Sequence, residues 1–315
     1  MFNVHCSMNR LRRLLIIGIL TFVLVSACKS NAPQQISSQT DNTAAEAVRV
    51  VDHAIGKTKV PINPQRVVVL SDGLDTALSL GIKPVGSTQS LKEDDYLENR
   101  LEEIESVGTP GQPNLEAIVA LKPDLILGIK SDNQYNYKLL SQIAPTVLAE
   151  TKTNGDWQTI LSQYAEALGK TDKAEQITRA YKARIEKFQA QMGDRLQETK
   201  VSIVNVRQDR IYVYLENTFC GKIVADAGLP RPSHQTILGN SPSIKIGKEL
   251  LHKADGDIIF IWTSGSADSE TVRKAQSELE QLKADPLWSK LNAVQQGKVY
   301  EVPGYWGEWV RSQLT

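Results

Sequence analysis

Short apolar runs alternate with helix-like segments in two separate parts of this sequence, and this alternation restricts the fold more than any other feature. Each run is almost continuous and rich in β-branched residues, which is typical of a strand buried on both faces, as in a parallel sheet. The runs span residues 66–70, 83–86 and 124–127 in the first part and 201–206 and 257–261 in the second, with helical segments at 75–80, 115–121 and 222–227. The pattern predicts an α/β fold with two sets of strands and helices.

A long amphipathic segment separates the two sets. Its apolar residues recur at spacings of three and four: Ala174, Ile177, Tyr181, Ile185, Phe188, Met192 and Leu196. The spacing predicts a helix of roughly 25 residues, about 38 Å long. A surface helix packed on a single domain is the alternative. The position of the segment favours two lobes joined by a single long rigid helix, with a ligand cleft between the lobes and only small lobe movements.

Two helix–turn–strand units of equal length suggest that the lobes are alike. Glu116 is followed eight residues later by Asp124 and three apolar residues, and Glu249 is followed eight residues later by Asp257 and three apolar residues. A single repeat of this spacing can arise by chance. It predicts a unit of the same construction in each lobe.

The N-terminal residues indicate the compartment. A basic region with Arg10, Arg12 and Arg13 precedes an apolar run over residues 14–25, which is long enough for a signal peptide but short for a membrane span. The following Val25-Ser26-Ala27-Cys28 resembles the lipobox of bacterial lipoproteins. We therefore expect lipidation at Cys28 and an extracytoplasmic protein anchored to the cell membrane. An ordinary cleaved signal and an uncleaved anchor are the alternatives, and inner or outer membrane is left open.

These features divide the chain into five expected segments. Residues after Cys28 are rich in Ser, Asn, Gln, Thr and Ala, and such a composition predicts a flexible tether. The expected segments are a signal peptide at 1–28, a tether at 29–50, an N-terminal lobe at 51–155, a connecting helical segment at 156–197 and a C-terminal lobe at 198–315.

Composition and motifs exclude several classes of function. Acidic and basic residues balance at 36 each, so no global field favours nucleic acid. Two cysteines survive removal of the signal peptide, and lipidation of Cys28 leaves Cys220 as the one free cysteine, which excludes a disulfide framework. His53, His234 and His252 form no ligand-like cluster, which argues against a zinc or manganese binder. Phosphate-cradling loops and the common hydrolase and zinc-protease motifs are absent from the sequence, so we expect neither an enzyme nor a cofactor.

Several segments, in order along the chain, resemble the iron–siderophore-binding proteins of ABC importers. They are residues 56–70, 78–86, 107–108, the Pro113-Asn114-Leu115-Glu116 motif, 121–126, 140–147 and Gly228-Leu229-Pro230-Arg231-Pro232. The likeness extends from about residue 50 to residue 306. It implies a helical-backbone binding protein of the siderophore, haem and cobalamin class.

The resemblance implies a cargo and partners. The expected cargo is a ferric siderophore, and the partners are an ABC permease dimer with its ATPase and the membrane through the lipid on Cys28. Glu116 and Glu249 match the acidic residues that dock onto permease arginines in that family, and simple solvated helix residues are the alternative. Haem or cobalamin as cargo, and a non-transport envelope lipoprotein, remain alternatives.

Candidate ligand contacts follow from the rule that ligands bind beyond the carboxyl ends of parallel strands. On the first lobe these are Ser71, Asp72, Thr88, Tyr135 and Tyr137, near Ser87 and Lys130; on the second lobe they are Arg207, Trp262 and Trp306, near Thr263 and Tyr305. A bulky, anionic ferric siderophore needs aromatic walls and one or two cations rather than direct metal ligands.

Each main candidate has a structural alternative. Arg207, which follows a strand, is the preferred cation, but it can also open a hairpin with Asp209. Trp262 can pack in the core. Tyr135 and Tyr137 cannot both face the cleft if that loop is extended. We expect Trp157 to be a packing residue, and a structural role for Arg231 is at least as well supported as a binding role.

The sequence departs from the family pattern at two places. Some hydroxamate-binding relatives carry an arginine just before the Pro-Asn-Leu-Glu motif, where this chain has Thr109-Pro110-Gly111-Gln112, so a cation is missing and the siderophore type is left open. Relatives also continue into a final helix, whereas this chain ends at Thr315. Truncation of the C-terminal lobe is therefore left open.

Overall fold

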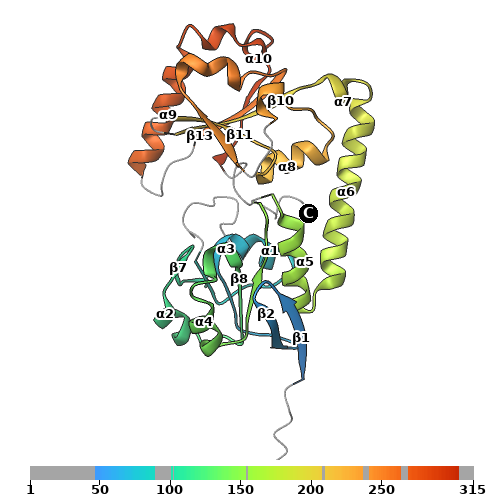
Figure 1. Cartoon of the computed structure of the whole chain (residues 1–315), viewed down its shortest axis with the longest axis vertical. Coiled ribbons are helices and arrows are strands. Elements are labelled where there is room, and N and C mark those ends of the chain that lie inside the picture. The colour runs from blue at the N-terminus through green and yellow to red at the C-terminus, as the bar shows by residue number, and fades with distance from the viewer. Residues whose placement is uncertain are drawn as a thin grey trace, which may run out of the picture. The chain divides into compact units, whose positions relative to one another are not determined.

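Two five-stranded sheets, each covered by helices, form the framework of the protein (Figure 1). The computed structural model describes residues 47–88, 101, 103–153, 155–207, 210–236, 241–263 and 269–304. These residues belong to one compact unit, Glu46–Thr315. The predicted α/β class with two sets of strands and helices is confirmed.

The first sheet is entirely parallel. Its strands, in spatial order, are β5 (Glu105–Ser106), β4 (Gly86–Ser87), β3 (Val67–Val69), β8 (Leu125–Ile129) and β9 (Thr146–Ala149). β3, β8 and β9 are buried along their whole length, as near-continuous apolar strands require.

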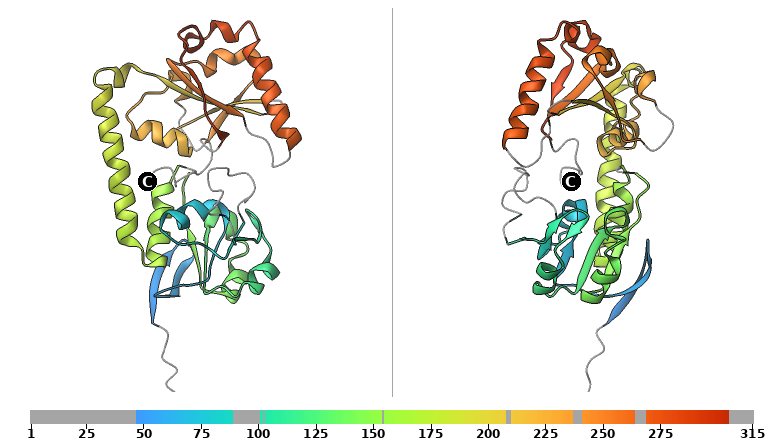
Figure 2. Two further views of the ribbon diagram at one scale, coloured as in Figure 1. Left: turned by 180° about the vertical axis from the view of Figure 1, so that it is seen from behind. Right: turned by 60° about the vertical axis from the view of Figure 1, so that its left-hand side comes forward.

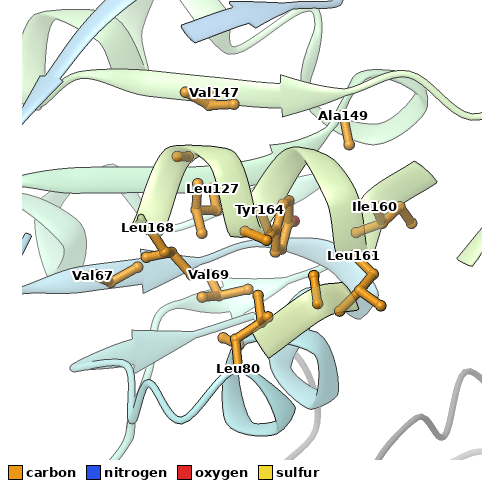
Figure 3. Close-up of a cluster of buried hydrophobic side chains, with 14 of the residues drawn as sticks. Val67, Val69, Leu80, Leu127, Val147, Ala149, Ile160, Leu161, Tyr164 and Leu168 are labelled. Carbon is orange, nitrogen blue, oxygen red and sulfur yellow. The ribbon is translucent and has the colours of Figure 1, made fainter. Parts of the chain in front are cut away.

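Helices cover both faces of this sheet. One face packs against α5 (Trp157–Leu168) and residues of α1 (Leu74–Ser79), with Leu168 beside Val67 and Ile160 near Ala149 (Figure 3). The other face packs against α2 (Leu115–Ala120) and α4 (Tyr137–Ile143). The short helices η1 (Ser71–Gly73) and α3 (Lys130–Asn133) follow β3 and β8 directly.

A hairpin of β1 (Val48–His53) and β2 (Gly56–Pro61) attaches to the β9 side of the sheet. The Ala54 N–H donates to Leu148 O at 3.0 Å, and Thr58 Oγ1 donates to Thr146 O at 3.2 Å. The hairpin includes Val48 to Val50, which were assigned from the sequence to the tether. A second hairpin joins β6 (Gly108–Thr109) and β7 (Gln112–Pro113).

The second sheet is mixed. Its order is β12 (Ser243–Ile246), β11 (Arg210–Tyr214), β10 (Val201–Arg207), β13 (Ile258–Thr263) and β14 (Val299–Glu301). β10, β13 and β14 are parallel to one another, and β11 is antiparallel to both of its neighbours, β10 and β12. One face packs against α8 (Phe219–Asp226). The opposite face packs against η4 (Lys248–Ala254), α9 (Ser269–Lys283), η5 (Trp288–Lys290) and α10 (Asn292–Gln295), while η3 (Ser233–Gln235) lies in a connection.

The two helix–turn–strand units predicted from the sequence make the same kind of hydrogen bond, one in each sheet. Asp124 precedes β8 and accepts from the backbone N–H groups of Gln65 and Arg66, at 2.6 and 2.9 Å, just before β3. Asp257 precedes β13 and accepts from the N–H of Lys200 at 2.8 Å, just before β10. In both sheets an aspartate therefore binds the start of the neighbouring parallel strand.

A single long helix, α6 (Thr171–Met192), runs between the two sheets (Figures 1 and 2). Its 22 residues span about 33 Å. It ends at Gly193, and α7 (Arg195–Glu198) follows, so the predicted continuation of one helix to Leu196 is wrong. The predicted connecting segment also included α5, but α5 packs in the core of the first lobe, which leaves α6 and α7 as the connection.

Side chains of α6 contact both lobes. Tyr181 packs edge-on against Trp157, with ring centres 4.9 Å apart, and donates its hydroxyl hydrogen to Asp226 of α8 at 2.9 Å. Gln189 Nε2 donates to Asp226 O at 3.2 Å. Because α6 begins beside the amino end of the first sheet and leads to the amino end of β10, the carboxyl ends of the parallel strands in both sheets point toward the middle of the unit.

The length and hydropathy of the described helices decide whether any of them could span a membrane. Within the described ranges, no helix has the length and apolar content needed to cross a bilayer.

Candidate functional site

The carboxyl edge of the first sheet is held together by a buried polar network. The Ser71 N–H donates to Thr88 Oγ1 at 2.7 Å, and Ser71 Oγ donates to Asn133 Oδ1 at 2.9 Å. The Ile129 N–H also donates to Asn133 Oδ1, at 3.3 Å. The three side chains are 0–2% exposed. They tie the ends of β3, β4 and β8 together, so ligand contact by Ser71 and Thr88 stays a prediction.

Ser71 has a backbone conformation that points to a site. Its φ of 57° lies in the left-handed region, which costs a non-glycine residue about 1–2 kcal/mol. Such strain persists where surrounding contacts fix it, and it clusters at functional sites. Gly128 contributes to the same arrangement, because a Cβ there would lie 2.7 Å from Asn133 Oδ1.

Lys130 and Glu150 form an ion pair at the same edge. They directly follow β8 and β9, and their charged atoms are 2.8 Å apart. The Glu150 N–H also donates to Gln163 Oε1 at 3.2 Å. The pair is partly exposed and supplies a cation at the end of the first lobe's strands.

The two tyrosine candidates lie in different places. Tyr135 is 88% exposed. Tyr137 begins α4, and its hydroxyl lies 3.5 Å from Thr58 Oγ1, which in turn donates to Thr146 O at the amino end of β9. This is the end of the sheet opposite the predicted ligand edge, so the position of Tyr137 gives its predicted role no support. Asp72 lies in η1 next to Ser71; its side chain is outside the described part of the structure.

The carboxyl edge of the second sheet brings an arginine and three aromatic residues together. Asn205 of β10 is paired in register with Tyr212 of β11 and Trp262 of β13. Side chains alternate along a strand, so Arg207 and Tyr214 lie on the same face as these three. Arg207 is exposed at the end of β10 and pairs in register with Arg210 of β11; Asp209, the partner in the structural alternative, lies outside the described residues.

The guanidinium of Arg207 is fixed by its neighbours. Its Nε donates to Asn205 Oδ1 at 2.9 Å, its Nη2 donates to the Tyr214 hydroxyl at 3.3 Å, and its Cζ lies 5.0 Å from the centre of the Tyr212 ring. Within the described residues, no partner is seen for its Nη1. Trp262 lies inside β13 rather than after it, is 2% exposed, and packs edge-on against Tyr214 with ring centres 5.0 Å apart.

Arg231 and Cys220 lie behind this edge. Arg231 donates to Tyr214 O and to Gln235 Oε1, the latter at 2.9 Å, so it fastens the loop after α8 to β11. Burial lowers the pKa of Arg231 to about 10, and burial raises the pKa of the Cys220 thiol. Arg231 therefore has a structural role, and Cys220 is an inert packing residue. Trp157, as predicted, is fully buried.

The two candidate docking glutamates occupy equivalent positions. Glu116 lies in the first turn of α2, which Asn114 caps by accepting from the Ala117 N–H at 3.1 Å. Glu249 lies in the first turn of η4. Both are exposed, and each helix leads into the strand whose preceding aspartate holds the neighbouring strand. Carboxylates are favourable at helix N-termini, so a local role accounts for part of this placement.

Three residues of the site were missed by the sequence reasoning. Asn133, Tyr212 and Tyr214 sit in polar or mixed segments with no distinctive motif. Strand register could have found the two tyrosines, since Tyr212 and Tyr214 alternate with buried Ile211 and Val213, whereas Asn133 lies in α3 and gives no such signal. Cys28, Trp306 and Tyr305 lie outside the described residues. Within those residues no group of three or more His, Cys, Asp or Glu side chains could hold a metal ion.

Comparison with known proteins assigns the chain to a protein family. Residues 67–305 match a family model described as periplasmic binding protein. The chain belongs to the periplasmic binding protein family. This family is one of binding proteins, not of enzymes.

Particular members of the periplasmic binding protein family are similar to this chain. It is 33% identical over 299 residues to the probable siderophore-binding lipoprotein YfiY of Bacillus subtilis, covering 92% of this chain and 89% of that protein. It is 33% identical over 250 residues to the achromobactin-binding periplasmic protein of Dickeya dadantii, covering 76% and 79%. The crystal structure of Staphylococcus aureus SirA complexed with staphyloferrin B matches with a TM-score of 0.73 and 31% identity, over 84% of this chain and 94% of that one.

Proposed function

We propose that this chain is the substrate-binding component of an ABC importer and captures a ferric siderophore outside the cytoplasmic membrane. Family membership supports a binding role. The name of YfiY and the ligand in the SirA structure support a siderophore as the cargo.

The observation that carries the proposal is the Arg207 cluster at the carboxyl edge of the second sheet. A ferric siderophore has its iron already chelated, so it offers oxygen atoms with partial or full negative charge and an organic skeleton. A guanidinium can donate two parallel hydrogen bonds to such oxygens, and aromatic rings can pack against the organic skeleton. Arg207 is exposed, held in place by Asn205 and Tyr214, and stacked on Tyr212.

The first lobe supplies the opposite side of the proposed site. Lys130, held by Glu150, lies at the carboxyl edge of the parallel sheet and replaces the cation that the sequence before Pro113 lacks. Ser71, Asp72, Thr88 and Tyr135 remain proposed contacts or supports on this side, and Trp262 and Trp306 on the other. The iron is cargo, and we propose no resident cofactor.

Delivery requires a permease and a membrane position. Glu116 and Glu249, one on each lobe, are proposed to engage basic residues of the permease dimer that an ATPase drives. Because α6 joins the lobes, engagement of one carboxylate raises the effective concentration of the other. Lipid on Cys28 is proposed to keep the protein at the membrane surface, where the permease lies.

Ligand-dependent quenching of tryptophan fluorescence tests the proposal. Trp262 lies at the proposed site, so a panel of ferric siderophores should contain one that quenches emission saturably, with the iron-free form binding more weakly. Trp262→Phe should remove much of this signal, which identifies the quenched tryptophan as the one at the proposed site. Saturable binding of haem or cobalamin, with no response to any ferric siderophore, would contradict the proposed cargo.

A further inference from the structure

The outward face of the β1–β2 hairpin exposes a group of large apolar side chains. Val48 and Val50 of β1 are 48% and 56% exposed, and Ile55 in the turn is 39% exposed. On the inward face, Val51 and Val60 are fully buried against the first lobe. Single exposed apolar residues are ordinary, but three on one short hairpin indicate a contact surface.

Lysines lie on the same outward face. Lys59 is paired in register with Val50, and Lys57 with Asp52, whose carboxylate lies 3.4 Å from Lys57 Nζ. Lys57 and Lys59 are exposed. Apolar side chains flanked by lysines suit the boundary between headgroups and acyl chains of an anionic lipid surface. A second copy of the chain on the same face would bring like charges together, which disfavours self-association.

The position of the hairpin in the chain also favours a lipid surface as its contact. Ala47, the first described residue, is 19 residues after Cys28. A chain of that length has a root-mean-square span of about 24 Å if it is unstructured. This step rests on the proposed lipidation of Cys28, which is part of the proposed function. With the lipid inserted, the hairpin is the described element that is nearest to the bilayer along the chain, and even weak contacts are favoured by effective concentration.

We propose that the outward face of the β1–β2 hairpin, formed by Val48, Val50, Lys57 and Lys59 with Ile55 in the turn, rests on an anionic lipid surface. The hairpin is bonded to β9 through the Ala54 N–H and Thr58 Oγ1, so this contact orients the first lobe relative to the membrane. It is a resting position that docking on the permease replaces.

Lipid-quenching of a label on the hairpin tests this inference. The lipidated full chain carrying Val50→Cys is labelled with an environment-sensitive fluorophore and reconstituted into vesicles of phosphatidylcholine and phosphatidylglycerol containing nitroxide lipids. Cys220 is buried and so leaves position 50 as the reactive thiol. The matched control is Glu186→Cys on the exposed surface of α6. The label at position 50 should be quenched several-fold more than the label at 186, and Lys57→Glu with Lys59→Glu should remove most of the difference.

The outcomes separate this inference from the function. Vesicle flotation reports the anchor, and ferric siderophore titration of the same preparation reports both folding and the cargo. Equal quenching at positions 50 and 186, in protein that floats and binds siderophore, would overturn the lipid contact alone. Protein that binds siderophore but does not float would overturn the anchor and this inference with it. Disulfide-linked dimers through position 50, without lipid quenching, would identify a second copy as the occupant and also overturn it.

Discussion

The guanidinium of Arg207 lies over the ring of Tyr212, with Cζ 5.0 Å from the ring centre. Stacking and the hydrogen bond to Asn205 restrict the guanidinium before ligand arrives, so little further ordering is needed when an anionic oxygen binds.

Replacing this arginine should weaken cargo binding. Arg207→Ala removes a charge-assisted hydrogen-bond donor, and we expect the Kd for the ferric siderophore to rise by about tenfold to a hundredfold. Arg207→Lys should recover only part of the loss, because an ammonium cannot fork or stack in the same way. Arg179→Ala, at an exposed arginine of α6, is the control and should leave the Kd unchanged. Equal affinity in Arg207→Ala and the wild type would remove this residue from the site.

The two docking glutamates should separate transport from binding. Glu116→Ala combined with Glu249→Ala should abolish uptake of radiolabelled ferric siderophore in cells, while the Kd of the purified protein stays within twofold of the wild type, roughly the scatter of surface substitutions. Each single variant should retain partial uptake, because one contact remains. Glu186→Ala, an exposed carboxylate on α6, should transport normally. Loss of ligand affinity in the double variant would refute the docking role.

The repeated aspartates should contribute to stability in both lobes. Asp124→Asn replaces an acceptor of two backbone N–H groups and should lower the free energy of unfolding by about 1–3 kcal/mol. Asp257→Asn affects one such bond and should cost less, about 1 kcal/mol. Denaturant unfolding measures both, and Asp194→Asn at an exposed position is the control. If neither variant differs from the control, the aspartates do not hold the strand starts.

Tyr181 should stabilise the connection between α6 and α8. Tyr181→Phe removes the hydrogen bond to Asp226 and should lower the free energy of unfolding by about 1–3 kcal/mol, whereas exposed Tyr300→Phe should not. Burial, then the hydrogen bond and the charge of Asp226, raise the pKa of Tyr181. The folded state therefore holds this proton more tightly, so its contribution is complete below about pH 10 and is lost as pH rises further. A wild-type advantage that already declines between pH 7 and 9 would contradict this assignment.

Much of the fold follows from the sequence because buried parallel strands have a distinctive apolar pattern. The runs at 66–70, 124–127 and 257–261 correspond to β3, β8 and β13, and the long amphipathic segment corresponds to α6. Glycine at 193 ended α6 earlier than the apolar spacing indicated, since spacing alone does not locate a helix end. The β1–β2 hairpin was not predicted, although Val48 and Val50 favour a strand, because they directly follow a polar segment and were assigned to the tether.

The candidate site was predicted less completely, because it depends on contacts between strands that are distant in sequence. The rule on strand ends identified Ser71, Thr88 and Arg207 as edge residues, but not that Ser71 and Thr88 are buried and bonded to each other. Tyr137 sits in the same short segment as Tyr135, yet the turn of α4 directs it toward Thr58 instead of the carboxyl edge. Tyr212 is identified only once β10 and β11 are in register, and Asn133 only once α3 folds back to accept hydrogen bonds from Ser71 and Ile129.

Retention of iron in equilibrium dialysis tests the central claim most directly. Purified protein is dialysed against radioactive iron supplied either as a ferric siderophore or as a weakly chelated ferric salt, with the Arg207→Ala variant in parallel. The account predicts about one equivalent of iron retained per chain when a suitable siderophore carries it, little from the salt, and a reduced amount in the variant. Equal retention from the ferric salt, or none from any siderophore tested, would contradict it.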